Sequence, residues 1–382
     1  MTPTIPLSAP DITEAEIAAV TAVLRTPQLS LGPELAAFES ALAEYHSASH
    51  AIAVSSGTAG LHMALLTLGI GEGDEVIVPS FAFIAVANAV LHVRATPVFA
   101  DIDSVTLNLT PATVERVLSP RTRAMLVVHT FGIPADMLAL RTLARRHNLM
   151  IIEDACEAIG AGLHQQRVGS FGDLAVFGFY PNKQITTGEG GAVLAHTQSH
   201  ADRLRSLRNQ GRNPNPASTE EIPPASDWLH HPDIGFNYRL SDIACALGRV
   251  QLSRLDQILA LRRAAAERYQ SLLANISGLG LPPLTLPDRT ISWFVYVVGL
   301  PEAADRPRIQ AFLANHGIAS ATYFSPIHRQ PAWHSRSASP PHLPVTESIG
   351  SRTLALPCFT RISSTEQEQV ALALHAALMS QK

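Results

Sequence analysis

The sequence has few cysteines, few charged residues and no long apolar run, and each shortage excludes a class of protein. Its three cysteines, Cys156, Cys245 and Cys358, are odd in number and far apart, which fits reduced thiols in a cytoplasmic protein better than a disulfide framework. Charged residues make up only 16%, and the net charge of −4 comes without a basic run, so nothing indicates a nucleic-acid partner. The most apolar stretch, residues 81–93, is too short to span a bilayer.

Lysine is also scarce. Of the 28 basic residues 26 are arginine, and only Lys183 and the C-terminal Lys382 are lysine. Arginine replaces lysine wherever only positive charge is needed, but its guanidinium stays protonated and cannot form an imine. One interpretation is a general drift toward arginine, and the other is that Lys183 is kept for the chemistry of its amine.

The sequence does have enough apolar material for a large core. Its 382 residues correspond to about two domains at roughly 150 residues each, and 46% of them are hydrophobic. Residues 1–10 lack the charged and apolar regions of a signal peptide, and the sixteen histidines show no metal-ligand spacing. We expect a globular cytoplasmic protein with a small-molecule partner, no membrane contact and no metal.

Strand and helix patterns alternate along the first half of the chain. Short apolar runs that indicate strands are separated by stretches of helical periodicity, and the runs lie at residues 51–54, 75–78, 96–101, 124–129 and 150–154. This alternation predicts an α/β fold with a mostly parallel sheet covered by helices on both faces. Two proline-rich segments, 211–232 and 330–345, are expected to be exposed loops.

The remainder of the chain has a different pattern. Residues 241–273 are typical of one long helix or two helices in series, and a mixture of helices and strands follows, with one strand expected at 321–324. We therefore predict an N-terminal arm and large domain over residues 1–250 and a smaller α+β domain over residues 251–382.

Lys183 lies just before a glycine-rich turn that leads into an apolar strand. The flanking Phe177, Phe179 and Ile185 place it among apolar side chains. A lysine in a desolvated pocket loses its proton more readily and becomes a nucleophile that can form a Schiff base. The alternative is an ordinary surface lysine on a loop.

Two further motifs stand where a strand ends. Glu153 and Asp154 close an apolar strand, a position where open α/β sheets place groups that contact ligands. A carboxylate there can keep the ring nitrogen of a pyridine cofactor protonated. Residues 55–58, Ser-Ser-Gly-Thr, lie between a strand and a helix, so free amides and the positive end of the helix form an anion site. The alternatives are a solvated acid and an ordinary helix cap.

With Lys183, these motifs supply an imine-forming amine, an acid for a ring nitrogen and a phosphate site, which are the requirements for holding pyridoxal phosphate. Further motifs follow in order along nearly the whole chain: Gly32-Pro33, Phe38-Glu39, Ser56-Gly57-Thr58-Ala59, Pro79 to Phe83, Asp101-Ile102-Asp103, Glu153-Asp154-Ala155, Lys183 with Gly188 to Gly191, Asn237 to Asp242, and Pro326-Ile327-His328. In this series the chain resembles the fold-type-I pyridoxal phosphate enzymes of the sugar aminotransferase family called DegT/DnrJ/EryC1/StrS.

The resemblance implies roles around the cofactor. Lys183 would form the internal aldimine with pyridoxal phosphate and carry the proton between substrate carbon and cofactor carbon. Asp154 would hold the pyridine nitrogen, Glu157 would lie near the phenolic oxygen, and Phe83 would stack on the ring.

The resemblance also implies a phosphate site and a substrate site. Gly57 and Thr58 would bind the phosphate, with Asn237 reaching across from the second subunit of a homodimer. Contacts with the nucleotide sugar would come from His328, Tyr180 and Arg239. The alternatives are a loop histidine with all its hydrogen bonds satisfied for His328, and packing and structural ion-pair roles for Tyr180 and Arg239.

Two positions depart from the family pattern. The family often has serine where Gly178 stands, and that hydroxyl helps to bind phosphate, so Thr58, Asn237 and backbone amides must suffice here. The family often has histidine or glutamine at the position of Glu157, which raises the question of whether this acid carries a proton.

The expected activity is transfer of an amino group in two half-reactions. An amino acid, with L-glutamate expected, would donate to the cofactor, and a nucleotide-linked 4-keto-6-deoxy sugar would accept. A second hypothesis is the deoxygenating branch of the same family, which typically has histidine in place of Lys183. A third is a non-catalytic regulatory protein that binds pyridoxal phosphate, which would predict a missing lysine or aspartate.

Overall fold

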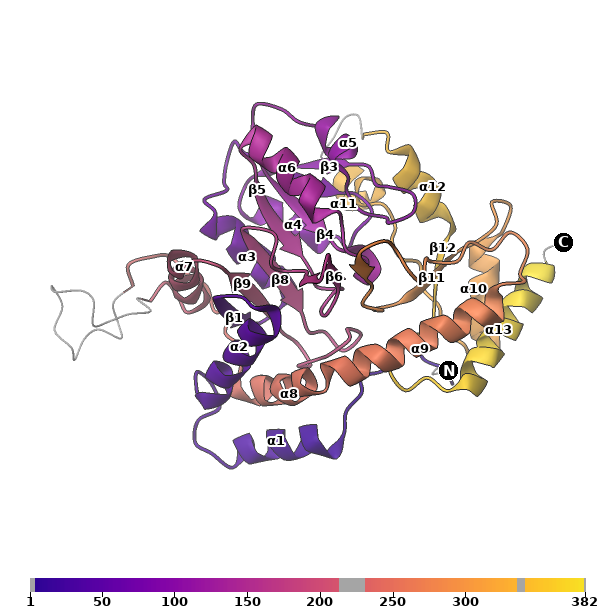
Figure 1. The fold of residues 1–382 in the computed structure, drawn as a ribbon, viewed down its shortest axis with the longest axis horizontal. Coiled ribbons are helices and arrows are strands. Elements are labelled where there is room, and N and C mark those ends of the chain that lie inside the picture. Colours follow the sequence, from indigo (N-terminus) through magenta and orange to yellow (C-terminus); the bar gives the residue numbers. More distant parts are fainter. Residues whose placement is uncertain (1–3, 213–230, 335–340, 381–382) are drawn as a thin grey trace.

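A seven-stranded sheet forms the centre of the larger part of the molecule (Figure 1). The computed structural model describes residues 4–212, 231–334 and 341–380. In spatial order the strands are β1 (His50–Val54), β9 (Gly191–Ala195), β8 (Leu174–Gly178), β5 (Met150–Asp154), β4 (Thr122–Val128), β2 (Glu75–Pro79) and β3 (Thr96–Ala100). β9 is antiparallel to both neighbours and all other pairs are parallel. The predicted mostly parallel α/β sheet is confirmed.

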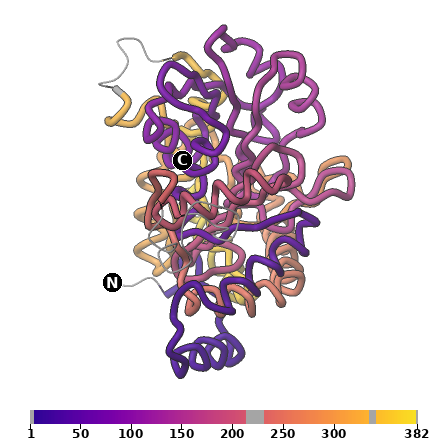
Figure 2. The backbone as a smooth tube through the Cα atoms, turned by 90° about the vertical axis from the view of Figure 1, so that its left-hand side faces the viewer, coloured from indigo at the N-terminus to yellow at the C-terminus, as the bar shows by residue number. Residues whose placement is uncertain are grey.

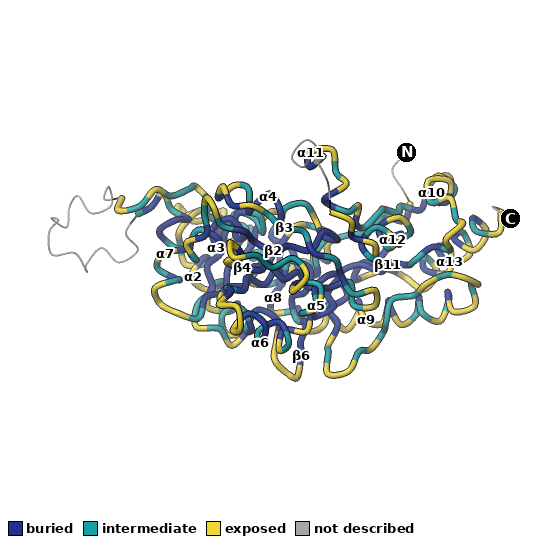
Figure 3. Tube along the Cα trace, turned by 90° about the horizontal axis from the view of Figure 1, so that it is seen from above, coloured by how far each residue is buried: buried dark blue, intermediate teal, exposed yellow. Residues whose placement is uncertain are grey.

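Helices cover both faces of this sheet because successive strand residues point to opposite sides. Ile52 and Val54 of β1 pack on one face, whereas Ala51 and Ala53 pack on the other. The first face is covered by α3 (Gly57–Thr67), α4 (Ala85–His92) and α7 (Gln198–Arg208). The second is covered by α2 (Pro33–His46), α5 (Pro111–Glu115), α6 (Met137–His147) and α8 (Asp242–Ser253). Figure 3 shows the buried residues running through the middle of the molecule.

The C-terminal part has a core of its own. β11 (Tyr296–Gly299) and β12 (Thr353–Leu356) pair antiparallel and pack with α10 (Arg306–Asn315) and α13 (Ser364–Met379). The long helix α9 (Leu255–Leu273) belongs to both parts, because Ile258 packs with the large sheet and Tyr269 with the C-terminal core. Shorter elements are β6 (Gly162–Leu163), β7 (Gln166–Arg167), β10 (Arg289–Thr290), α11 (Pro331–His334), α12 (Pro344–Arg352) and the 3-10 turns η1 (Thr130–Gly132) and η4 (Ile327–Arg329).

The N-terminal helix α1 (Glu14–Leu24) lies at the edge of the molecule (Figure 2). It packs against α8, and the chain before it pairs Ile5 with Ile318 of the C-terminal part. Its start is a capping box, in which the Thr13 side chain accepts from the Glu16 backbone and the Glu16 side chain accepts from the Thr13 backbone.

Of the two alternatives expected over 241–273, one long helix or two helices in series, the structure has the second, with the break between α8 and α9 at Arg254. The strand predicted at 321–324 is wrong: only Ala321 forms a bridge, to Ala355, because the chain pairs at one residue and then leaves β12. Much of the two predicted loops, residues 213–230 and 335–340, lies outside the described residues. The division at residue 250 stays a prediction.

Candidate active site

The predicted lysine, the predicted aspartate and the predicted anion site come from elements that meet at one edge of the sheet. β1, β5 and β8 run in the same direction, so their carboxyl ends meet at that edge. β5 ends at Asp154, β8 ends at Gly178 just before the Lys183 loop, and β1 leads through Ser56 into α3. Open α/β sheets bind their ligands at this edge.

The Lys183 amine lies in a largely enclosed position, and its side chain is 15% exposed. Its Nζ is 3.7 Å from Glu157 Oε1 and 4.1 Å from the centroid of the Phe294 ring. The backbone is fixed as well, because Lys183 N–H donates to the Tyr180 carbonyl at 2.9 Å. The amine therefore has the Glu157 carboxyl group on one side and the Phe294 ring face on another.

Glu157 is buried beside this amine. Its Oε2 accepts a hydrogen bond from Phe131 N–H at 2.9 Å, and its own carbonyl accepts from the Gln184 side chain at 2.7 Å. Burial raises the pKa of Glu157, the Lys183 ammonium opposes the rise, and the Asp154 carboxylate adds to it. The acid at this position is thus biased toward its protonated form.

The two acids at the end of β5 have different environments. Asp154 Oδ1 accepts from Cys156 N–H at 3.0 Å. The neighbouring Glu153 points to the other side of the strand, where it accepts from His129 Nε2 at 3.0 Å and from three backbone amides of residues 169–172. His129 Nδ1 accepts from Ala135 N–H, so the ring proton lies on Nε2. Glu153 therefore holds a loop in place, and Asp154 is the acid on the site side.

The anion site predicted at residues 55–58 has the expected local structure. Ser56 caps α3 by accepting from Ala59 N–H at 3.0 Å, which leaves the amides of Gly57 and Thr58 outside the helix's own hydrogen bonding. A side chain at Gly57 would place its Cβ 2.7 Å from Cys156 Sγ, so only glycine fits.

Cys156 also accounts for the glycine at 178. A Cβ at Gly178 would lie 3.2 Å from Cys156 Sγ and 3.3 Å from its Cβ, so the cysteine fills the space that a serine side chain would enter. Burial raises the pKa of the Cys156 thiol well above its ordinary value of 9.0, with the Asp154 charge adding to the effect. The thiol stays neutral and acts as packing.

The Lys183 amine, the Asp154 carboxyl group and the backbone at Gly57 therefore lie around Cys156, whose thiol interacts electrostatically with Asp154, Lys183 and Glu157. These groups fit pyridoxal phosphate, because the pyridine nitrogen, the aldehyde and the phosphate each find a group of suitable chemistry.

Of four more predicted residues, three are exposed on the surface and one makes a hydrogen bond to a neighbouring side chain. Phe83 and Tyr180 are exposed, at 61% and 52%, and Asn237 is exposed where its backbone bridges to Asn209. Arg239 Nη1 donates to the Asn209 side chain at 2.9 Å. Their roles stay predictions.

His328 is 2% exposed, and both ring nitrogens have partners. Nδ1 lies 2.6 Å from Ser80 Oγ, and Nε2 lies 3.1 Å from Glu347 Oε1. A contact with substrate would require one of these bonds to be exchanged, so the substrate role stays a prediction.

Three aromatic residues at the site were missed from the sequence. Phe294 lies against the amine, and Phe131 donates its amide to Glu157. Burial raises the pKa of Tyr323 and the Glu157 charge adds to the rise, which places this phenol near the same carboxylate. They come from segments far from Lys183 in the chain, and no periodicity or motif marks them.

Comparison with known proteins identifies the family. Residues 10–375 match the DegT/DnrJ/EryC1/StrS aminotransferase family. The chain belongs to this family. It is 39% identical over 353 residues to GDP-perosamine synthase of Caulobacter vibrioides, covering 92% of this chain and 91% of that protein. It is 40% identical over 342 residues to dTDP-3-amino-3,4,6-trideoxy-alpha-D-glucose transaminase of Streptomyces venezuelae, covering 89% and 86%.

A solved structure agrees. The pyridoxal phosphate form of the putative sugar aminotransferase Spr1654 from Streptococcus pneumoniae has a TM-score of 0.90 at 26% identity and covers 99% of both chains. The chain is therefore a fold-type-I, pyridoxal phosphate-dependent aminotransferase whose relatives include sugar aminotransferases. The expected family, fold, cofactor and reaction type are confirmed.

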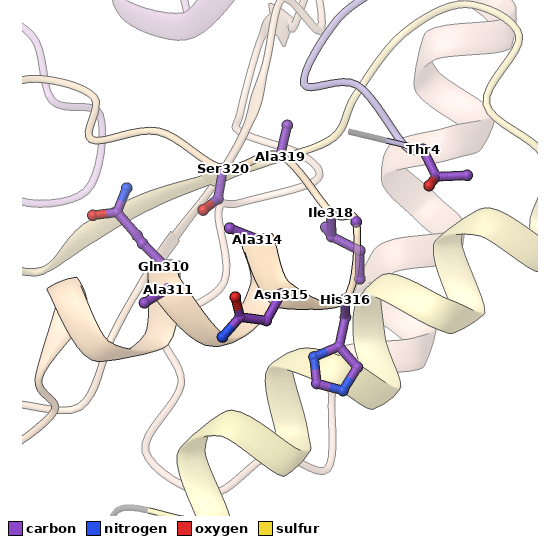
Figure 4. Close-up of a pocket in the computed structure, with 10 residues that line it drawn as sticks. Thr4, Gln310, Ala311, Ala314, Asn315, His316, Ile318, Ala319 and Ser320 are labelled. Carbon is purple, nitrogen blue, oxygen red and sulfur yellow. The ribbon is translucent and has the colours of Figure 1, made fainter. Parts of the chain in front are cut away.

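A hollow elsewhere in the molecule carries none of the predicted site residues. It lies at the end of α10, between that helix and residues 317–320, with Thr4 at its rim (Figure 4). The His316 ring there bonds to the Phe312 carbonyl of its own helix. None of the helices in the described ranges has the length and apolarity needed to cross a membrane.

Proposed function

We propose that the enzyme transfers the amino group of L-glutamate to a nucleotide-linked 4-keto-6-deoxy sugar, and that Lys183 carries the chemistry. The observation that supports this most strongly is the position of the Lys183 amine, enclosed between Glu157 and Phe294 at the ligand-binding edge. The names of the relatives support the substrate class, because they specify GDP-linked and dTDP-linked sugars. One of those names places the amino group at carbon 3, so the ring carbon is a point for experiment.

The residues divide the work. When bound, pyridoxal phosphate stores the amino group between the two half-reactions. Asp154 would keep the ring nitrogen of the cofactor protonated, and Glu157 and Phe83 would help to hold the ring, Glu157 near its phenolic oxygen and Phe83 by stacking. Lys183 moves a proton between the substrate carbon and the cofactor carbon, a positioned transfer that contributes roughly 10²–10⁴-fold.

The phosphate and the substrate are held by residues from several segments. The amides and hydroxyl at Gly57 and Thr58 bind the phosphate, and Asn237 of a second subunit completes that site in a homodimer. Tyr180, Arg239 and His328 contact the nucleotide sugar.

The first experiment tests the covalent role of Lys183. The cofactor-loaded protein is reduced with borohydride and mapped by peptide mass spectrometry, and the label is expected on Lys183. Labelling elsewhere, or none, would overturn the proposal. In Lys183→Arg we expect a folded protein that still binds pyridoxal phosphate but has no turnover, because a guanidinium cannot release its proton.

The second experiment tests the substrates. Nucleotide-linked ketosugars are offered in a panel with L-glutamate, and products are identified by mass spectrometry. A gain of one amino group on a 4-keto-6-deoxy sugar is the expected result. Amination of only other ketosugars, or removal of a hydroxyl, would contradict the proposed acceptor.

A further inference from the structure

Arg262 is one of the largest fully buried side chains in the part of the chain that the structure describes, and it contacts the Lys183 loop. It comes from the middle of α9 and is 1% exposed. Its Nη2 donates to the Lys183 carbonyl at 3.2 Å. Its Nη1 points at the carbonyls of Trp293, Phe294 and Cys358, at 3.4, 3.1 and 3.5 Å. The guanidinium therefore connects α9 to three other segments of the chain.

This guanidinium makes no ion pair with any carboxylate in the described part of the chain. Asp11, whose charge still acts on it, is engaged by Arg254 and Arg361. Burial lowers the pKa of Arg262. Burying a cation without a counter-ion destabilises the fold and carbonyl dipoles offset only part of that cost, whereas an apolar side chain of similar size would fill the space without it. In natural proteins, unfavourable arrangements such as a buried charge without a counter-ion are found mainly at functional sites.

The contacts of Arg262 involve both sides of the amine's environment. One carbonyl belongs to Lys183 itself, and another belongs to Phe294, whose ring centroid lies 4.1 Å from Lys183 Nζ. The guanidinium is planar, with its donors in a fixed fork, so it holds these two backbone segments at a set separation. A lysine ammonium has no such fork and could not bind both in the same geometry.

We propose that Arg262 is a positioning residue for Lys183: it fixes the lysine backbone relative to the Phe294 ring, so that the amine reaches the cofactor and the substrate carbon in one orientation. The inference rests on the proposed role of Lys183. Arg262 acts only through main-chain carbonyls and touches neither cofactor nor substrate. Because a misplacement of about 1 Å can cost about 10²-fold in rate, the orientation of the amine is where the effect should be seen.

The test compares Arg262→Lys, which keeps the charge but loses the fork, and Arg262→Met, which loses both. Arg306 provides a matched control, because it is half-buried and its Nη1 donates to the carbonyls of Gly350 and Thr353 without involving Lys183. Arg306→Met removes the same type of bond. Each holoenzyme is measured for thermal stability, for the rate of the first half-reaction with L-glutamate, and for the pH at which the absorbance of the lysine-bound cofactor changes.

We expect both Arg262 variants to lose about tenfold to a hundredfold in the first half-reaction and to shift the pH midpoint of the cofactor absorbance. The glutamate concentration that half-saturates the rate should stay within about twofold of wild type. Arg306→Met should lower thermal stability while leaving the rate and the absorbance midpoint unchanged. If Arg262→Met fails to fold, Arg262→Lys carries the test.

The inference is overturned if Arg262→Lys keeps the wild-type rate and midpoint, or if Arg306→Met slows the reaction as much. Its failure can be told apart from failure of the proposed function. If borohydride leaves Lys183 of the wild type unlabelled, the proposed function fails whatever Arg262 does. If Lys183 is labelled and the Arg262 variants behave as wild type, only the positioning role is lost.

Discussion

The carboxylate of Glu16 should hold the N-terminal helix α1 on the rest of the protein, and replacing it with glutamine tests this. Glu16 is 1% exposed. Its Oε2 accepts from Thr13 N–H at 2.7 Å, and its Oε1 accepts from the Gln251 side chain at 2.8 Å and pairs with Arg254. Burial alone would raise the pKa of Glu16, but the hydrogen bonds from Thr13, Gln251 and Arg254 outweigh it and lower the pKa to about 2.

The size and the sign of the effect follow from that value. Lowering the pKa of Glu16 from its ordinary 4.5 to about 2 stabilises the folded ionised form by about 3 kcal/mol, since each pKa unit corresponds to about 1.4 kcal/mol. Because the folded pKa is the lower one, this stabilisation is present above pH 4.5 and is lost as the pH falls toward 2. At pH 3, which lies between the two pKa values, less than half of this stabilisation should remain.

Amide hydrogen exchange of peptides covering α1 measures this locally. In Glu16→Gln, which mimics the protonated acid, local opening of α1 should be about 300-fold more frequent at pH 7 than in wild type and about tenfold more frequent at pH 3. Glu14→Gln is the control, because it removes the same charge from the same helical turn at an exposed position, and it should change opening little.

Two results would refute this reasoning. One is an equal effect of Glu14→Gln and Glu16→Gln, which would mean that the helix dipole and net charge account for the change. The other is a Glu16→Gln effect of the same size at both pH values, which would mean that packing, and not the ionised carboxylate, holds α1.

Three further predictions concern the site. Glu157→Gln should gain stability relative to wild type as the pH rises from 4 to 8, because burial raises the pKa of Glu157 and ionising this acid in the folded protein costs free energy. Urea unfolding at several pH values measures this, and a difference in free energy of unfolding between variant and wild type that stays the same at every pH would contradict it. Gly178→Ser should weaken pyridoxal phosphate binding and lower thermal stability by about 1–3 kcal/mol, because its Cβ would meet Cys156. Adding Cys156→Ala should restore both, and no recovery in the double variant would show that the contact is not the cause. Mixing Lys183→Ala with Asn237→Ala, each inactive alone, should restore about a quarter of the activity if the sites are shared between subunits; a mixture without activity would show that they are not.

The sequence was sufficient to predict the residues that follow directly on sheet strands. Apolar runs and glycine-rich turns are local features, so the positions of Asp154, Lys183 and the helix start at Gly57 near strand ends follow from their immediate neighbours in the chain. The different roles of Glu153 and Asp154 follow from the two-residue period of a strand, which sends neighbours to opposite faces. Because the strand ending at Asp154 was predicted, the same two-residue period could have assigned Glu153 and Asp154 to opposite faces of the sheet.

What could not be predicted depends on contacts between distant segments. Phe294 and Arg262 reach the Lys183 loop from positions 111 and 79 residues further along the chain, and nothing in their own neighbourhoods marks them. The glycine at 178 was recognised only as a departure. The cause is the space that the Cys156 side chain occupies, and this can be recognised only from the distance between Gly178 and Cys156 in the structure.

The reversed strand β9 has a consequence for the lysine between it and β8. Because Gly178 and Gly191 are opposite one another in this pair, the intervening segment leaves the sheet and returns to it at a single edge. Both ends of the segment that carries Lys183 are thus held by the hydrogen bonds between β8 and β9. Had β9 run the other way, the chain would have had to cross the length of the sheet before re-entering it, and Lys183 would lie on a long crossover whose two ends join the sheet at opposite edges.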